Sequence, residues 1–407
     1  MRILMVSEDL PAIGMGGLAR HVLALARRLS ADGHLVDLMG NDDVTPAQAG
    51  DEFDIDGRFF PELRGQFDGW KEMRAGVFMP PKRSVIARRF AHAILRRASD
   101  YDVVHYHGHL PNIAYYLPAS LNFIQTRHDQ GSDCLIHVRY KRGEICVSTV
   151  PADCAGCRTW QPNPLQKLVS AVAVMRFRSE VRQGFLRHKT VFVSDMLQQN
   201  LMRTFGQRRW GVTVHNFVDT GRLQQLRLRA RIPGEGRLRI FIAAKLYPAK
   251  GVETFLNELV TRPDGRLQVE IAGDGADESR LRQRFPTVFF HGLLDARDTL
   301  RLAARADAVV VPSVCEEACP STVLEALLLG KPVFALKLGG TPELAAYQSG
   351  PDQLRLYATM AQLVDALLAF RPRPDYPFAP ASPTGPAEAA GRLLALYRLP
   401  PGAIATQ

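Results

Sequence analysis

Two glutamates in the second half of the chain stand where a carboxylate could meet a substrate. Glu317 and Glu325 lie eight positions apart and follow the apolar run 308–311. We expect Glu317 in the loop after a buried strand and Glu325 in the first turn of the next helix, so that both side chains can face one cleft. Each also has a simpler interpretation, because Thr322 and Glu325 match a capping box and Glu317 is a charge in a solvated loop.

A glycine pair with a helix-start signal follows one predicted strand later, in the sequence Gly-Gly-Thr-Pro-Glu from Gly339 to Glu343. Gly339 and Gly340 would let the backbone approach a ligand closely. Thr341 is expected to cap a helix with Pro342 at its first position, and a helix N-terminus attracts anions. Together with the two glutamates, this signal favours a ligand site over unrelated helix caps.

A second glycine-rich turn lies near the start of the chain. The apolar run 3–7 predicts a strand, residues 14–17 (Gly-Met-Gly-Gly) a turn, and residues 18–30 a helix. Backbone amides near Gly16 and Gly17 are therefore expected to face a phosphate group. The spacing differs from Gly-x-Gly-x-x-Gly, which argues against a dehydrogenase.

The elements around these signals predict an α/β protein of two domains. A length of 407 residues is too great for one hydrophobic core. Strand-like runs alternate with helical patterns in both halves, which predicts parallel, doubly wound sheets. The expected strands are 3–7, 35–39, 102–106, 122–126, 191–194, 212–215, 238–243, 268–271, 288–290, 308–311 and 333–336. The expected domains are an N-terminal one at 1–222, a linker at 222–237, a C-terminal one at 237–385 with a proline-rich segment at 372–386, and a helix at 386–407 that packs back on the first domain.

Composition and charge narrow the class of protein. Hydrophobic residues make up 46% and charged residues 23%, as in a globular protein. No run of 18 apolar residues and no signal-peptide core is present, so we expect a cytoplasmic protein with reduced cysteines. The net charge of +10 predicts polyanionic partners: nucleotide phosphates, anionic lipid or nucleic acid. Nucleic acid is the weakest of these, because no helix-turn-helix or interleaved aromatic-basic motif is present.

The most basic segment is 82–97, which holds six Lys or Arg residues and no acid. Val85, Ile86, Phe90 and Ile94 recur at helical spacing and predict an amphipathic helix. Two interpretations stay open. The helix docks on an anionic membrane surface, or its apolar face covers the sheet while its basic face is solvated.

These motifs resemble, in the same order, those of retaining GT-B glycosyltransferases of family four, the glycosyl transferases of group 1. The stretch 312–326 is similar to the paired-glutamate signature of their C-terminal domain. The opening strand with Gly16, Gly17 and His21 is similar to the start of their N-terminal domain. Further similar segments are 102–109, 126–129, 192–194 and 215–219. The resemblance implies two Rossmann-like domains facing a central cleft.

The resemblance also implies a reaction. A hexose would pass, with retention of configuration, from a UDP- or GDP-sugar to a hydroxyl of a glycan, glycolipid or small acceptor in cell-envelope polysaccharide or lipopolysaccharide synthesis. A lipid-linked acceptor would place the enzyme beside the inner face of the cytoplasmic membrane. No protein nucleophile, catalytic metal or other cofactor is expected, and the donor is a substrate.

Individual roles follow from the same resemblance. Lys245 and Lys250 would hold the diphosphate, with the amides of Gly16, Gly17, Gly339 and Gly340. Glu325 would bind the ribose, Glu317 would lie beside the donor sugar, and His128 would reach that sugar from the N-terminal domain. The donor-binding set is completed by Thr322, and the catalytic set is His128, Lys250 and Glu317.

Two positions depart from the family pattern. Lys245 stands where the family usually has arginine, and lysine lacks the planar bidentate contact with phosphate. Pro320 replaces a commoner glycine in the loop expected to touch the sugar. A nucleotide-sugar epimerase or a sugar phosphorylase on the same fold is the alternative enzyme class.

Two further sets of residues could hold metal. His105, His107 and His109 alternate along a strand and its exit, but no neighbouring carboxylate or cysteine in the sequence completes a site, so we expect them to line the acceptor cleft. An insertion at about 130–160 carries four cysteines, the last two as Cys-x-x-Cys, which suits a structural zinc site or four reduced thiols. These cysteines are Cys134, Cys146, Cys154 and Cys157.

Overall fold

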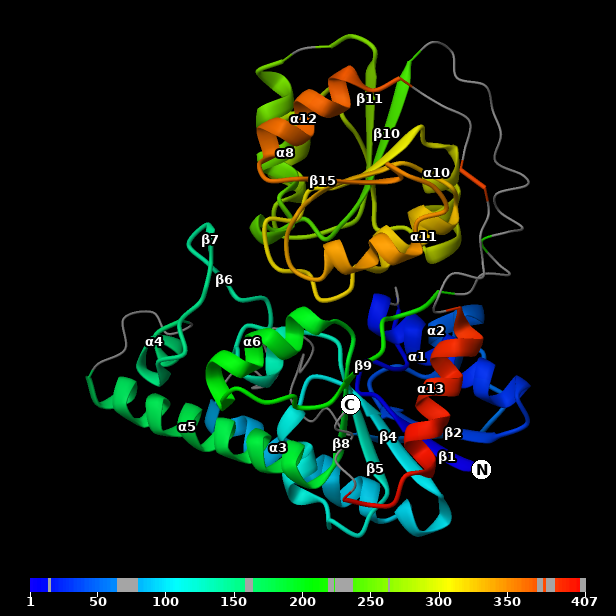
Figure 1. Cartoon of the computed structure of the whole chain (residues 1–407), viewed down its shortest axis with the longest axis vertical. Coiled ribbons are helices and arrows are strands. Elements are labelled where there is room, and N and C mark those ends of the chain that lie inside the picture. The colour runs from blue at the N-terminus through cyan, green and yellow to red at the C-terminus, as the bar shows by residue number, and fades with distance from the viewer. Residues whose placement is uncertain are drawn as a thin grey trace. The chain divides into compact units, whose positions relative to one another are not determined.

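The computed structural model describes residues 1–13, 16–63, 80–157, 164–218, 223, 237–262, 264–371, 376–377 and 385–402. The chain divides into two compact units (Figure 1). Unit 1 comprises Met1–Lys141, Cys146–Asn216 and Ala387–Gln407, and unit 2 comprises Arg142–Ile145 and Phe217–Pro386. Most of the predicted linker 222–237 and of the proline-rich segment 372–386, with Gly14 and Met15, lies outside the described residues.

Unit 1 is built on a parallel sheet with the strand order β3-β2-β1-β4-β5-β8-β9. The strands are β1 (Arg2–Val6), β2 (Leu35–Asn41), β3 (Phe59–Leu63), β4 (Val103–His107), β5 (Phe123–Arg127), β8 (Lys189–Phe192) and β9 (Val212–Thr213). The helices are α1 (Gly17–Ala31), α2 (Pro46–Ala49), α3 (Pro80–Leu95), α4 (Pro151–Ala155), α5 (Pro164–Arg187), α6 (Asp195–Phe205) and α13 (Pro386–Arg398). Central strands such as β1 are continuous apolar runs because helices cover both faces of a parallel sheet.

Unit 2 repeats the plan with the strand order β12-β11-β10-β13-β14-β15, again all parallel. The strands are β10 (Leu238–Ala243), β11 (Leu267–Ala272), β12 (Phe289–Gly292), β13 (Ala308–Val311), β14 (Val333–Leu336) and β15 (Leu354–Tyr357). The helices are α8 (Val252–Val260), α9 (Glu278–Arg284), α10 (Ala296–Arg305), α11 (Ser321–Leu328) and α12 (Met360–Ala369). A separate pair, β6 (Tyr140–Lys141) and β7 (Glu144–Ile145), forms a small two-stranded sheet.

The α/β class and the doubly wound sheets are confirmed. The sequence missed two edge strands, β3 and β15. β3 contains Pro61, which is tolerated at a sheet edge but weakens the strand signal. In β15, Arg355 and the half-buried Tyr357 break the apolar run that marks a central strand.

Strand order also shows where each sheet places its functional edge. In unit 1 the order reverses between the neighbouring strands β1 and β4, and in unit 2 between β10 and β13. Ligands of open parallel sheets bind beyond the carboxyl ends of the strands at such a reversal. The loops that follow these four strands are therefore the first places to look for a site.

Helix α13 is held on unit 1 by polar contacts at the sheet. The hydroxyl of Tyr397 lies 2.6 Å from Nδ1 of His105, and Asn122 Nδ2 donates to the Tyr397 carbonyl at 2.9 Å. Lys189 Nζ donates to the carbonyls of Leu396 and Leu399 at 2.9 and 2.7 Å, at the end of the helix. A cation at a helix C-terminus is favourable, so Lys189 both closes α13 and ties it to β8.

Helix α3 uses its apolar face internally. Ile86, Phe90 and Ile94 are buried in the core of unit 1. Arg83 is also fully buried, where it donates to the Leu135 carbonyl at 3.0 Å. Of the two interpretations of segment 82–97, the structure therefore supports the one in which the apolar face covers the sheet. Among the helices of the described residues, none has the length and apolar character to cross a bilayer.

Candidate functional site

In unit 2 the loops after β10 and β13 are joined to each other. The amides of Val314 and Cys315 donate to the Ala249 carbonyl at 3.0 and 3.2 Å. Gly251 has a φ of 67°, and a Cβ there would lie 2.0 Å from the Pro312 carbonyl oxygen. Only glycine fits this close approach, which brings the segments around Lys250 and Glu317 together.

Lys250 and Glu317 form an ion pair between these two loops. The Ser313 hydroxyl donates to the same carboxylate oxygen, Oε1 of Glu317, at 2.7 Å. Burial acts to raise the pKa of Glu317, but the Lys250 charge and hydrogen bonds from Lys250 and Ser313 outweigh it and lower that pKa. Burial likewise acts to lower the pKa of Lys250, and the charge of Glu317 reverses this, so the pKa is raised. Both groups are ionised near neutral pH.

Lys245 lies on the same loop but in a more open setting. Its Nζ is 2.8 Å from Oδ1 of Asp274, which follows β11, and the two side chains are 53% and 39% exposed. Exposed ion pairs of this kind contribute little net stability. Lys245 can therefore leave Asp274 for an incoming anion at low cost.

Gly339 and Gly340 contact the loop that holds Glu317. Gly339 has a φ of 62°, and a Cβ at this position would lie 2.7 Å from both the nitrogen and the carbonyl oxygen of Glu317. The Gly340 amide donates to the Glu317 carbonyl at 2.8 Å. The sequence predicts that Gly339 and Gly340 approach a ligand. In the structure, the contacts given for these two glycines are with the backbone of the loop that holds Glu317.

The alternative interpretation of Glu325 as part of a capping box is wrong, and so is the predicted cap at Thr341. The residue that caps α11 is Pro320, without a side-chain hydrogen bond, so Thr322 and Glu325 do not form a capping box. Glu325 lies in the second turn of α11 and is half-buried, as is Thr322. The 3-10 helix Thr341–Tyr347 is capped by Gly340, so Thr341 is its first residue and not its cap.

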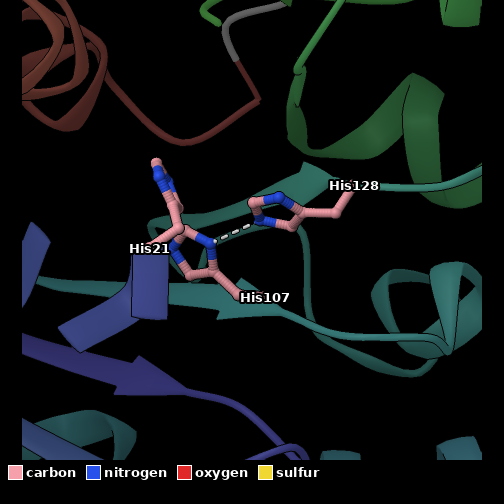
Figure 2. Close-up of side chains that lie close together, drawn as sticks. All are labelled: His21, His107 and His128. Atoms are coloured by element: carbon pink, nitrogen blue, oxygen red, sulfur yellow. Dashed lines mark hydrogen bonds between the residues drawn. The ribbon is translucent and has the colours of Figure 1, made fainter. Parts of the chain in front are cut away.

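In unit 1, the predicted His128 lies beside two further histidines (Figure 2). His128 follows β5, His107 ends β4, and His21 lies on α1. The Nε2 of His128 is 3.0 Å from Nδ1 of His107, and the rings of His21 and His128 are 5.2 Å apart in an edge-on contact. Three elements that meet at the β1/β4 reversal thus bring three imidazoles together.

Burial keeps two members of this histidine cluster neutral. It lowers the pKa of His107 and of His128 well below the usual value, and neighbouring histidines and Arg127 add to the effect. Among the described residues, neither Nε2 of His107 nor Nδ1 of His128 has a hydrogen-bond partner. Buried polar atoms are normally satisfied, so these two nitrogens are suited to a polar ligand group.

The predicted trio His105, His107 and His109 does not act as one set. His105 is fully buried between Tyr397 and Thr126, and burial lowers its pKa to about 3. Its role is to hold α13, so the prediction that it lines an acceptor cleft is wrong. The three residues lie on one face of β4 and its exit but at different distances along the strand, so each meets different neighbours.

His109 belongs to a charged network at the same edge of the sheet. Its Nε2 is 3.0 Å from Asp9 and its Nδ1 is 2.7 Å from Asp129, so both ring nitrogens donate to carboxylates. Asp129 also accepts from His137 Nδ1 at 2.9 Å. Burial acts to lower the pKa of His109, but Asp9 and Asp129 raise it well above the usual value. The expectation that no carboxylate stands near these histidines is therefore wrong, and His109 is an imidazolium.

A buried carboxyl group fixes the backbone of the loop that carries His109. Oε1 of Glu8 accepts from the hydroxyl of Tyr106 at 2.7 Å and from the His109 amide at 2.6 Å. Gly108 leaves room for this side chain, because a Cβ there would lie 1.8 Å from Oε2 of Glu8. Burial raises the pKa of Glu8.

Gly16 and Gly17 begin α1 beside this edge. Gly16 caps the helix in an extended conformation, no side chain caps it, and no acid lies in the first turn. A Cβ at Gly16 would meet nothing within 4 Å. The amides of the first turn thus stay available to an anion.

Comparison with known proteins identifies the family. The family model "Glycosyltransferase Family 4" matches residues 15–222, and the model "Glycosyl transferases group 1" matches residues 237–370. The chain belongs to glycosyltransferase family 4. The resemblance read from the motifs is confirmed, and the protein is a glycosyltransferase enzyme.

Curated relatives of this glycosyltransferase match it over different lengths. A GDP-mannose-dependent alpha-mannosyltransferase of Mycolicibacterium smegmatis is 38% identical over 140 residues, which cover 34% of this chain and 36% of the relative. The chain is thus matched to about a third of that relative's length. A glycogen synthase of Mycobacterium tuberculosis is 27% identical over 360 residues, or 84% of this chain and 80% of the relative.

Solved structures confirm the GT-B fold of the family 4 enzyme. Sucrose-phosphate synthase from Thermosynechococcus elongatus has a TM-score of 0.61 at 17% identity, covering 97% of this chain and 94% of that one. Anabaena HepE in complex with UDP-glucose has a TM-score of 0.53 at 17% identity, covering 97% and 94%. WaaG, a glycosyltransferase involved in lipopolysaccharide biosynthesis, has a TM-score of 0.58 at 14% identity, covering 90% and 89%.

Two residue sets of this glycosyltransferase have the spacing of metal ligands. One is His21, His107 and His128, and the other is His109, Asp129 and His137; in each, one ligand atom per residue lies within 4.8 Å of the others. Each residue of both sets also takes part in a hydrogen bond or ring contact described above. No step of the reaction proposed below depends on an ion at either set.

The predicted zinc ligands share one cavity of about 150 Å³, which is lined by Cys134, Cys146, Cys154 and Cys157. They do not form a third set of ligand atoms with metal spacing among the described residues. Burial raises the pKa of Cys134 to about 11, and it also raises that of Cys154, which accepts from Arg178 at 3.1 Å. Tetrahedral zinc needs thiolates about 3.8 Å apart. The set as it stands does not have the spacing of a zinc site, which favours the other expectation, four reduced thiols.

The sequence missed the residues that support the predicted ones. Glu8 and Asp9 directly follow the first strand, and Asp129 directly follows His128, so their place after strands was available as a signal. Ser313 likewise follows the strand 308–311. The partners of Glu8 and Asp9 could not be read from the sequence, because their contacts join segments about 100 residues apart. Ser313 contacts Glu317 within its own loop.

Proposed function

We propose that this glycosyltransferase moves a hexose from a UDP- or GDP-sugar to a hydroxyl of a glycan, glycolipid or small acceptor, with retention of configuration. Unit 2 would bind the nucleotide sugar and unit 1 would bind the acceptor. The observation that carries the proposal is the Lys250–Glu317 pair with Ser313, at the strand-order reversal of unit 2. The relative named for GDP-mannose and the Anabaena structure with UDP-glucose support the donor class.

The lysines supply charge to the departing diphosphate. Lys250 is kept cationic by Glu317, and Lys245 can exchange Asp274 for phosphate. As the bond from the sugar to the phosphate breaks, negative charge grows on the phosphate oxygens and both ammonium groups stabilise it. The reaction proposed here therefore needs no catalytic metal.

Carboxylates and histidine act on the other parts of the donor. Glu317 shares its Oε1 between Lys250 and Ser313, and its second oxygen would accept from sugar hydroxyls. Glu325, with Thr322, would bind the ribose. His128 is neutral and has a buried nitrogen without a partner among the described residues, so it would contact the sugar as a hydrogen-bonding group.

Retention follows from attack on the face that the diphosphate leaves. The bond from the anomeric carbon to the phosphate oxygen breaks first, and the positive sugar is paired with the departing diphosphate. The acceptor hydroxyl then forms the new bond on the same face, and its proton passes to a phosphate oxygen. No protein nucleophile takes part.

The acceptor belongs to cell-envelope polysaccharide or lipopolysaccharide synthesis in this proposal. The similarity in fold to WaaG supports this class. Lipid-linked acceptors of this kind would be met in the cytoplasm, at the inner face of the membrane. An anionic membrane surface is then a second partner, and the net charge of +10 suits it.

The test begins with thermal unfolding of the full chain in the presence of UDP-, GDP- and ADP-sugars. A sugar that raises the unfolding temperature is then incubated with candidate acceptors, and the products are separated. Transfer releases a nucleoside diphosphate with an α-linked product from an α-linked donor. Release of a sugar phosphate, or of an epimerised nucleotide sugar, would instead establish a phosphorylase or an epimerase.

Two variants test the site within the same assay. Lys250→Ala and Glu325→Gln should each lower turnover by about a hundredfold or more, since single charge-stabilising groups contribute on this scale. Arg301→Ala is the matched control, because it removes a cation from an exposed pair with Asp298 in the same unit. Near wild-type turnover of both site variants would show that the site is wrongly placed.

A further inference from the structure

Helix α5 has two opposite apolar faces. Val174, Phe177, Val181 and Phe185 form the face that packs into unit 1. Five other large apolar residues of the same helix are 54–69% exposed: Leu165, Leu168, Val169, Val172 and Met175. At 100° per residue these five fall within an arc of about 120° that lies opposite the buried face. We call this set the α5 stripe.

The α5 stripe lies on a part of the helix that leaves the body of the unit. All residues from 164 to 169 are exposed, including those that face the same way as the buried set. In Figure 1 the first half of α5 extends with α4 away from the sheet of unit 1. Val147 and Val150, just before α4, are also exposed. Packing among the described residues of unit 1 therefore does not account for the apolar residues of the α5 stripe.

The exposed charges of helix α5 itself are of one sign, and the neighbouring helix α4 adds one exposed acid, Asp153. The exposed ionisable residues of α5 are Lys167, Arg176, Arg182 and Arg187. The single acid of the helix, Glu180, is buried and accepts from Ser84, Asn112, Tyr116 and Arg176. Helix α3, which packs against α5, likewise exposes basic residues and contains no acid. The surface around the α5 stripe is therefore cationic.

This combination selects among possible occupants. Each of the five side chains has about 100 Å² of apolar surface, of which somewhat over half is exposed, so the α5 stripe exposes roughly 300 Å². A stable protein interface buries roughly 800 Å² per partner, which is far more. A second copy of the chain would also bring the same basic residues against these ones. An anionic lipid surface has the opposite charge, and a shallow apolar stripe is enough to enter the boundary between headgroups and acyl chains.

We propose that α5 is a membrane-docking helix, whose stripe enters the surface of an anionic bilayer while its basic residues contact the headgroups. The proposal extends the proposed use of a lipid-linked acceptor, but it rests on residues that take no part in binding the donor. The proposed docking surface is thus α5 and not α3, for which the sequence left membrane docking as one of two interpretations.

The test is sedimentation of the full chain with vesicles. Wild type should bind vesicles of equal parts phosphatidylcholine and phosphatidylglycerol, and it should bind phosphatidylcholine alone at least tenfold more weakly. The double variant Leu168→Asp/Val172→Asp should lose at least tenfold in binding to the mixed vesicles. Its control is Leu35→Asp/Val260→Asp, which places the same charges at two apolar residues that are equally exposed but lie outside α5. The control should bind as wild type does.

A second variant tests the charges. Arg182→Gln/Arg187→Gln, at the two exposed arginines that flank the α5 stripe on the helix, should lower the preference for anionic vesicles while leaving the far-ultraviolet circular dichroism unchanged. Failure of wild type to bind the anionic vesicles, or equal binding by the α5 variant, would overturn the proposal. So would a wild-type dimer that the α5 variant converts to a monomer, since the α5 stripe would then be an interface between copies. Transfer to a soluble acceptor should be unchanged in the α5 variant, so failure of the transferase proposal would show separately.

Discussion

Replacing Lys250 with methionine should destabilise unit 2 in a way that depends on pH. The substitution keeps most of the side-chain volume but removes the cation that neutralises Glu317. Breaking a buried ion pair by removing one partner typically costs about 3–5 kcal/mol. Here the two side chains are 20% and 18% exposed, and Ser313 still donates to the carboxylate, so we expect about 2 kcal/mol at neutral pH.

The pH dependence follows from the sign of each pKa shift. In the wild type the pKa of Glu317 is lowered, so its contribution to stability is present above the ordinary value and is lost as the pH falls through the lowered one. In Lys250→Met, burial is the main remaining influence and raises that pKa. The stability of the variant should then be highest at acid pH and fall as the pH rises through the raised value. The difference between the two proteins should be small below about pH 4 and reach its full size near neutrality.

The assay has an internal control in the positions of the tryptophans. The sequence of unit 2 contains no tryptophan, and Trp210 is buried in unit 1, so tryptophan fluorescence reports the unfolding of unit 1 and should be unaffected. Far-ultraviolet circular dichroism, with hydrogen exchange of peptides from β13 and α11, reports unit 2. The double variant Lys250→Met/Glu317→Gln should regain most of the lost stability. Equal stability of Lys250→Met and wild type at pH 7, a pH-independent loss, or additive effects in the double variant would refute the reasoning.

Four further outcomes are expected. Gly339→Ala should lose about 1–3 kcal/mol of stability and most activity, because its Cβ would meet the Glu317 backbone. The control Gly391→Ala, in open space on α13, should gain up to about 1 kcal/mol. Equal unfolding temperatures of the two variants would contradict the role given to Gly339. His109→Gln should be less stable than wild type by about 1–2 kcal/mol below pH 6.5. The difference in stability should vanish at alkaline pH, because the carboxylates that raise the pKa of His109 stabilise only its protonated form. A difference that does not change with pH in urea unfolding would argue against the charged network. Tyr397→Phe should cost about 1–2 kcal/mol and expose α13 to limited proteolysis, since it unpairs the buried His105, and unchanged proteolysis would exclude this role. Elemental analysis of untagged protein should find well under one zinc per chain, and a full equivalent of zinc would establish the metal site. Cys134 should react with thiol reagents only after unfolding.

The sequence predicted the fold well because the fold depends on local patterns. Buried strands of a parallel sheet are apolar runs, and runs such as 238–243 and 308–311 coincide with β10 and β13. Glu317 was found for the same reason, since a loop after a central strand is where a site is expected, whereas Lys250 came from the family resemblance. The helix caps failed at Thr322, because whether a side chain caps depends on where the backbone turns and not only on residue type.

What the sequence could not supply is which buried group each side chain meets. His105 and His107 are two positions apart on one strand, yet His105 contacts a tyrosine from near the end of the chain and His107 contacts His128. Helices α3 and α5 show that the sequence also could not tell which apolar residues are buried and which stay on the surface. Both carry apolar and basic residues, and only the packing shows that α3 turns its apolar residues inward while α5 has apolar residues left over.

The docking of α13 also constrains how the chain can fold as it is synthesised. His105, Asn122 and Lys189, on or beside strands β4, β5 and β8, emerge from the ribosome 207 to 292 residues before their partners at the end of α13. Until α13 arrives, these buried polar groups must be hydrated or held by a chaperone. The first unit to be translated is thus among the last to be completed, and a ribosome stalled within unit 2 would present a nascent chain whose earlier domain is still open.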